Sequence, residues 1–184
     1  MSGLYLGLLW ALCTVVFFTD WLFRRVPNRL LIAVLVTYLS IRLADWAGLA
    51  VGTATDVQSS LVGGVLAFVF LLPFYMFRAM GAGDVKFFAV LGLLMGPAGV
   101  VVVWLVGTAL NGGHAVLQWM LGADAIPTIA NVGRVASAWV DGQSGRVQRF
   151  AAWVRDRRQG RKGIPYAAYM AIAALAQPWI SARL

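Results

Sequence analysis

The chain alternates long apolar stretches with short polar segments. Four apolar stretches stand apart at 3–19, 29–46, 59–77 and 164–180, and a longer one covers 87–121. Helices of such length rise about 1.5 Å per residue and come close to spanning a hydrocarbon core about 30 Å thick. Because the stretches are uniformly apolar and lack the alternation of barrel strands, they predict an all-α, polytopic membrane helical bundle.

The stretch at 87–121 is too long for a single crossing. Gly96-Pro97-Ala98-Gly99 falls inside it and predicts a turn or a sharp break. Two crossings here would give about six transmembrane helices and would keep most basic residues on one side of the membrane. Since basic residues mark the cytoplasmic side and none precedes the first apolar stretch, we expect the N-terminus outside and the loops after 3–19 and 59–77 inside.

Composition supports a membrane protein and argues against other classes. Hydrophobic residues make up 61% of the 184 residues and charged residues 12%, about half the charged share usual in soluble domains. The net charge of +8 comes from basic residues near the apolar stretches, where they set orientation, so we do not expect nucleic-acid binding. Cys13 is the one cysteine and His114 the one histidine, so we expect no internal disulfide, no metal site and no cofactor.

We expect a single membrane domain over 1–184, with a cytoplasmic insert at 122–163 before the last helix. Apolar residues recur in this insert at helical spacing opposite basic residues, which predicts two amphipathic helices. Two interpretations of the insert stay open. It is either a linker that lies on the membrane or a lid that covers bound substrate.

Two aspartates, Asp20 and Asp84, lie at the predicted cytoplasmic ends of apolar helices. An acid in this position is a functional candidate, although Asp84 could simply cap the helix that follows it. Two carboxylates held close together tend to share one proton. The ionised one can then take a proton from water while the protonated one hydrogen-bonds a scissile carbonyl. Such a pair would hydrolyse a peptide without a metal.

The residues around both aspartates resemble the type IV prepilin peptidase family, which are GxGD membrane aspartyl proteases. Gly81-Ala82-Gly83-Asp84-Val85-Lys86 matches the family signature GxGDxK, and Val26-Pro27-Asn28 after Asp20 is similar to the first-aspartate region. Ile164-Pro165-Tyr166 before a small-residue helix resembles the short form found with Tad/Flp-type pili. The sequence lacks the cysteine-rich domain associated with N-methylation, so the resemblance implies a peptidase without methyltransferase activity.

The resemblance implies that Asp20 and Asp84 are the catalytic pair of an aspartic-type endopeptidase. The enzyme would remove the short basic leader of type IV or Flp-type prepilins or pseudopilins at the cytoplasmic face of a bacterial inner membrane, alongside other pilus assembly proteins. Gly81 and Gly83 would shape the active-site loop. Lys86 would either position an acidic group near the cleavage site or anchor the loop on the inner side. Further candidate substrate contacts come from the two flanking motifs: Pro27, Asn28, Pro165 and Tyr166.

Three other functions stay open. A small ion- or proton-coupled transporter would use both aspartates and the polar patch Asn111-Gly112-Gly113-His114, but such sites lie near the bilayer midplane and these acids lie at one surface. The patch is otherwise explained by helix packing and hydrogen bonding. A non-catalytic pilus assembly membrane protein would not need both aspartates. A presenilin-like protease pairs its GxGD motif with a tyrosine-aspartate motif, whereas Thr19 precedes Asp20 here.

Overall fold

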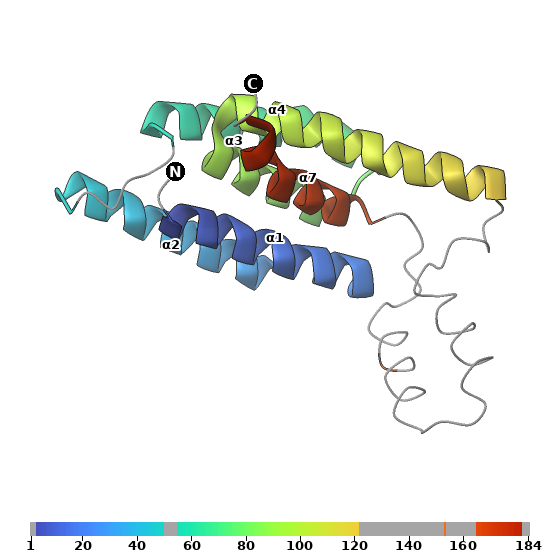
Figure 1. Cartoon of the computed structure of the whole chain (residues 1–184), viewed down its shortest axis with the longest axis horizontal. Helices are drawn as coiled ribbons and strands as arrows, with labels where there is room; N and C mark the ends of the chain where they lie inside the picture. The colour runs from blue at the N-terminus through green and yellow to red at the C-terminus, as the bar shows by residue number, and fades with distance from the viewer. Residues whose placement is uncertain (1–2, 50–54, 122–152, 154–164, 182–184) are drawn as a thin grey trace.

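The computed structural model describes residues 3–49, 55–121, 153 and 165–181, and regular structure over these residues is entirely helical (Figure 1). The described part contains five helices: α1 (Gly3–Phe23), α2 (Asn28–Trp46), α3 (Val57–Met76), α4 (Ala82–Leu121) and α7 (Tyr166–Ser181). Each predicted apolar stretch is a helix, which confirms the all-α class.

Three segments are long and apolar enough to cross a membrane: Tyr5–Phe23, Val57–Met76 and Ala82–Leu121. In α7, the apolar segment Tyr166–Gln177 is shorter. Large apolar side chains also stay exposed on the outer surface of the bundle; Leu43 is 65% exposed, Val65 63% and Trp119 85%. Contact of these side chains with lipid carries no free-energy cost, whereas their contact with water would be unfavourable. These features are those of a membrane protein, while six crossings and their orientation stay predictions.

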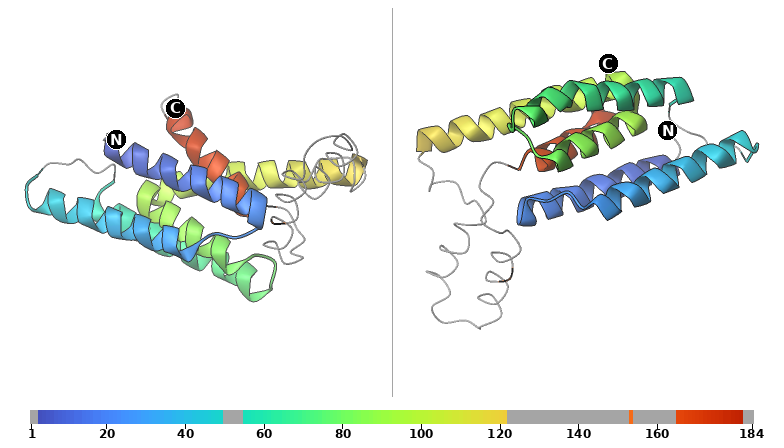
Figure 2. Two further views of the ribbon diagram at one scale, coloured as in Figure 1. Left: turned by 90° about the horizontal axis from the view of Figure 1, so that it is seen from below. Right: turned by 180° about the vertical axis from the view of Figure 1, so that it is seen from behind.

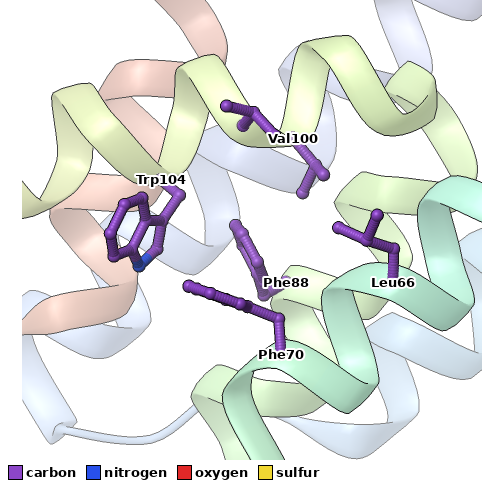
Figure 3. A pocket seen from close by; sticks show the side chains of 6 residues that line it. Leu66, Phe70, Phe88, Val100 and Trp104 are labelled. Carbon is purple, nitrogen blue, oxygen red and sulfur yellow. The ribbon is translucent and has the colours of Figure 1, made fainter.

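The prediction of a turn or sharp break at Gly96-Pro97-Ala98-Gly99 is confirmed, because α4 consists of two helical arms that meet at a kink at Gly96. Its 40 residues are helical except at Gly96, where φ is 70° and ψ is −178°. Glycine reaches this φ without a Cβ clash, and Pro97 next to it has no N–H to continue the helical bonding. Phe88 before the bend and Trp104 after it line the same pocket, so the two arms of α4 lie beside each other (Figures 2 and 3). The predicted break is therefore present, without a loop.

The pocket shared by α3 and the two arms of α4 has a volume of about 200 Å³ (Figure 3). Its lining is entirely hydrophobic and comprises Leu66, Phe70, Phe88, Val100, Val101 and Trp104. None of the predicted site residues contributes to it. The pocket is therefore distinct from the candidate site.

Helix α7 holds the bundle together, because it packs against both α1 and α4 (Figure 1). The core that these three helices share is built from small and medium apolar residues, among them Leu9, Leu12, Val16, Leu91, Met170, Ala171 and Ala174. Gly107 of α4 allows close contact with α7, because a Cβ on Gly107 would lie 3.3 Å from the Cα of Met170. Helix α2 touches α1 and α4 more lightly.

One long-range hydrogen bond sets the register between α1 and the first arm of α4. The hydroxyl of Tyr5 donates to the carbonyl oxygen of Leu94 at 2.6 Å, and both groups are buried. The bond joins the start of α1 to the end of the first arm of α4. From this junction α1 continues towards Asp20 near its C-terminal end. The first arm of α4 leads from the same junction back to Asp84 at its N-terminal end. The two aspartates therefore lie at the same end of the bundle.

Candidate active site

Asp20 lies in the last turn of α1 and is buried, with 5% of its surface exposed. Its Oδ2 accepts a hydrogen bond of 3.0 Å from the main-chain N–H of Ala168. Ala168 belongs to the first turn of α7, where N–H groups have no partner inside the helix and favour a negative charge. Pro165 is buried directly before this turn. The start of α7 therefore meets the carboxylate of Asp20.

Asp84 lies in the first turn of α4 and also caps that helix. The N–H of Gly81 donates to Oδ2 of Asp84 at 3.3 Å, and the N–H of Asp84 donates to the carbonyl of Gly81 at 3.1 Å. The first bond is the half of a capping box in which a carboxylate in the first turn accepts from the N–H before the helix, and Gly81 has no side chain to form the other half. The prediction that Gly81–Lys86 forms a turn or loop is wrong beyond its first residue, because α4 begins at Ala82 and includes Gly83 and Lys86.

The fold brings Asp84 within electrostatic range of Asp20, although the two residues belong to different helices. Arg24 also acts on Asp84, with the opposite sign. Both aspartates have much of their carboxyl surface covered by protein, so their mutual repulsion is less screened than at an exposed site. In two carboxyl groups that interact in this way, the protonation of each depends on the protonation of the other.

The segment that follows α1 packs directly on the first turn of α4. Arg24 ends the helix with a left-handed φ of 55°, and its N–H donates to the carbonyl of Asp20 at 3.0 Å. Two residues later, Val26 faces Gly83, where a Cβ would lie 3.2 Å from the Cβ of Val26. Gly83 therefore permits a close approach that a larger residue would hinder. Pro27 is half-buried and serves as the N-cap residue of α2.

Tyr166, the first residue of α7, joins the same cluster. Its hydroxyl is hydrogen-bonded to the hydroxyl of Thr108 at 2.8 Å, and Tyr166 lies within electrostatic range of Asp84. Asn28 and Lys86 are exposed, so the structure does not bring their side chains into the buried part of the cluster. Their predicted roles stay predictions.

Three contributors were missed by the sequence argument: Arg24, Thr108 and the N–H of Ala168. Arg24 stands four residues after Asp20, so helical spacing could have flagged it. Thr108 sits in an apolar stretch with no local signal. The main-chain N–H of Ala168 cannot be predicted from the pattern of side chains. Only the expected start of a helix after Pro165 could have indicated free N–H groups at this position.

The predicted amphipathic helices of the insert at 122–163 lie outside the described residues, apart from Trp153. The Trp153 ring meets the ring of Phe23 edge to face, with 5.2 Å between centroids. Phe23 is the last residue of α1, three residues beyond Asp20. Among the described residues, no three His, Cys, Asp or Glu side chains gather as metal ligands.

Comparison with known proteins identifies the family. A family model described as the type IV leader peptidase family matches residues 7–116, which is more than half of the chain and includes Asp20 and Asp84. No curated protein and no solved structure matches the chain. The matched region covers α1, α2, α3 and most of α4. The apolar helices fit a peptidase that works in a membrane, and the chain belongs to the type IV leader peptidase family.

Proposed function

We propose that the protein is an aspartyl endopeptidase in which Asp20 and Asp84 are the catalytic residues. One observation carries the proposal: two carboxyl groups from α1 and α4 come within electrostatic range of each other inside the region matched by the peptidase family. Paired carboxyl groups that share a proton are a known way to activate water at near-neutral pH. Asp84 caps α4 at the same time, and the two roles are compatible because a carboxylate can accept several hydrogen bonds.

The reaction would begin with one carboxyl group of the pair protonated and the other ionised. The ionised group takes a proton from a water molecule as the water oxygen attacks the scissile carbonyl carbon. The protonated group passes its proton to the carbonyl oxygen, which gives a neutral tetrahedral intermediate. The group that took the proton from water then gives it to the leaving nitrogen, while the other carboxylate takes a proton from a hydroxyl of the intermediate. The C–N bond breaks, a carboxylic acid forms, and the pair again holds a single shared proton. Arg24 offsets part of the negative charge near Asp84.

The substrate would be a type IV or Flp-type prepilin or pseudopilin with a short basic leader. Cleavage would take place at the cytoplasmic face of a bacterial inner membrane that the protein crosses several times, near other pilus assembly proteins. Gly83 supports this site by letting the segment after Asp20 reach α4. Pro165 and Tyr166 border the pair through α7, and Pro27, Asn28 and Lys86 would contact substrate at the exposed rim. Methyltransferase activity is not expected.

The test is co-expression with a prepilin encoded in the same genome. Leader removal is read from the N-terminal mass of the pilin, and wild type is compared with Asp20→Asn and Asp84→Asn. Each substitution keeps the side-chain volume and removes the ionisable group, so cleavage should fall at least about a hundredfold while membrane insertion is unchanged. Substantial cleavage by either variant would refute the two-aspartate mechanism.

A further inference from the structure

Polar side chains form a ridge along the second arm of α4, which we call the α4 ridge: Thr108, Asn111, His114 and Gln118. Spacings of three and four residues place them on one face of the helix. Polar groups in an apolar membrane helix rarely face lipid, and they mark packing contacts or a binding path. The ridge needs an explanation because the aspartate pair does not use most of it.

The α4 ridge runs along the start of α7, next to the aspartate pair. At one end Thr108 is bonded to Tyr166, which lies within electrostatic range of Asp84. Further along, the ring of His114 lies 5.7 Å from that of Tyr169. At the next turn of α7, α4 and α7 are in close contact, because Gly107 of α4 packs against Met170. The ridge is therefore continuous with the candidate active site.

The centre of the α4 ridge is Asn111. Its Oδ1 is buried and has no hydrogen-bond partner within the described part of the chain. His114 differs, because its Nε2 is hydrogen-bonded to Nε2 of Gln118 at 2.7 Å. A buried carbonyl oxygen without a partner is unfavourable and is uncommon unless it serves a purpose. Oδ1 of Asn111 is thus an acceptor able to receive an N–H from outside the described residues.

One glycine that borders the α4 ridge, Gly112, leaves room for that donor, because it follows Asn111 and stands four residues after Thr108. A Cβ on Gly112 would meet no atom within 4 Å outside its own stretch of helix. Packing among the described residues therefore does not require glycine here, although glycine weakens a helix. A bare helix surface of this kind lets another polypeptide backbone approach closely.

We propose that the α4 ridge binds the extended main chain of the substrate beside the scissile bond, with Oδ1 of Asn111 accepting a backbone N–H. This inference rests on the proposed peptidase function. A peptide must be extended at the cleaved bond to expose its carbonyl, and its N–H and C=O groups then need partners in an apolar setting. The α4 ridge offers a hydroxyl, an amide and an imidazole in a row, and it ends at the aspartates.

The test uses the purified full-length chain in nanodiscs and a prepilin from the same genome. Asn111→Leu removes the acceptor at similar volume, and Gly112→Leu fills the open surface beside Thr108. We expect KM to rise about tenfold in both variants while kcat stays within about twofold. The control is Thr37→Val, because the Thr37 hydroxyl bonds its own helix at Ala33 and is exposed. It should leave both constants unchanged.

A second arm separates this inference from the peptidase function. Binding of a fluorescent prepilin to the Asp84→Asn protein, with and without Asn111→Leu, needs no turnover. Weaker binding with Asn111→Leu supports the α4 ridge even where cleavage fails for another reason. Unchanged KM and unchanged binding in both ridge variants overturn the inference and leave the aspartate mechanism standing. A change of oligomeric state with unchanged KM would instead assign Gly112 to a contact between copies, which also overturns it.

Discussion

The main-chain N–H of Ala168 donates to Oδ2 of Asp20 at 3.0 Å and joins the start of α7 to the end of α1. The bond links residues far apart in the sequence and uses a donor that α7 itself cannot pair. It orients the carboxylate of Asp20, which is buried. The position of α7 is therefore expected to decide how well Asp20 faces Asp84.

Removing this donor should impair catalysis without unfolding α7. Ala168→Pro deletes the N–H, and proline is tolerated in the first turn of a helix because that N–H has no helical partner. We expect cleavage of a prepilin to fall at least about tenfold, since a charged hydrogen bond is lost. Ala167→Pro is the matched control, one residue earlier in the same buried turn. Equal activity of the two proline variants would show that the Ala168 bond is dispensable.

The contact between Gly83 and Val26 should respond to a compensating pair of changes. Gly83→Val adds side-chain atoms where a Cβ alone already lies 3.2 Å from the Cβ of Val26. We expect it to push the segment after Asp20 off α4 and to inactivate the enzyme. Gly83→Ala should lose less, and Gly83→Ala combined with Val26→Ala should recover activity because the space is restored. No recovery in the double variant would assign Gly83 a role other than close packing.

The sequence was sufficient for the parts of the structure that depend on patterns of side chains. Uniform apolar stretches predicted the helices, and the glycine-flanked Asp84 at the end of one of them drew attention to the site. The pattern could not show that Asp20 and Asp84 approach, because their proximity depends on the Tyr5–Leu94 bond and on the packing of α7. Electrostatic contact between residues of two different helices cannot be recognised from the residues next to either one in the sequence.

The spacing of glycines also does not show, from the sequence alone, which of them lie in a helix contact. Gly3 and Gly7 have the four-residue spacing of Gly92 and Gly96, and this spacing is typical of helix packing. In the structure a Cβ on Gly3 or Gly7 would meet nothing within 4 Å, whereas Gly92 and Gly96 lie against Gly63 of α3. Only the three-dimensional arrangement distinguishes a glycine that a neighbour requires from one that no described residue touches.

The cap of α3 should make stability depend on pH. Asp56 precedes α3, and the N–H groups of Gln58 and then Ser59 hold its pKa below the ordinary carboxyl range, about 4. A lowered pKa contributes stability at pH above the ordinary value, and this contribution disappears as pH falls through the lowered value. Asp56→Asn keeps a capping oxygen without the charge. The melting temperature of wild type should therefore exceed that of Asp56→Asn near pH 6, and the difference should shrink as the pH falls below the ordinary carboxyl pKa of about 4. A constant difference across this range would contradict the capping account.

The crossing of α3 and α4 should tolerate no added atom at its centre. A Cβ on Gly92 would overlap the carbonyl oxygen of Gly63, and a Cβ on Gly63 would overlap that of Gly92. Both obstacles are main chain and cannot move aside without shifting a helix. Gly92→Ala should therefore destabilise the protein by about 1–3 kcal/mol, the usual cost of overpacking. The control is Gly7→Ala, because its added methyl enters open space. Thermal unfolding in detergent compares the two, and equal melting temperatures would mean that α3 and α4 do not cross this closely.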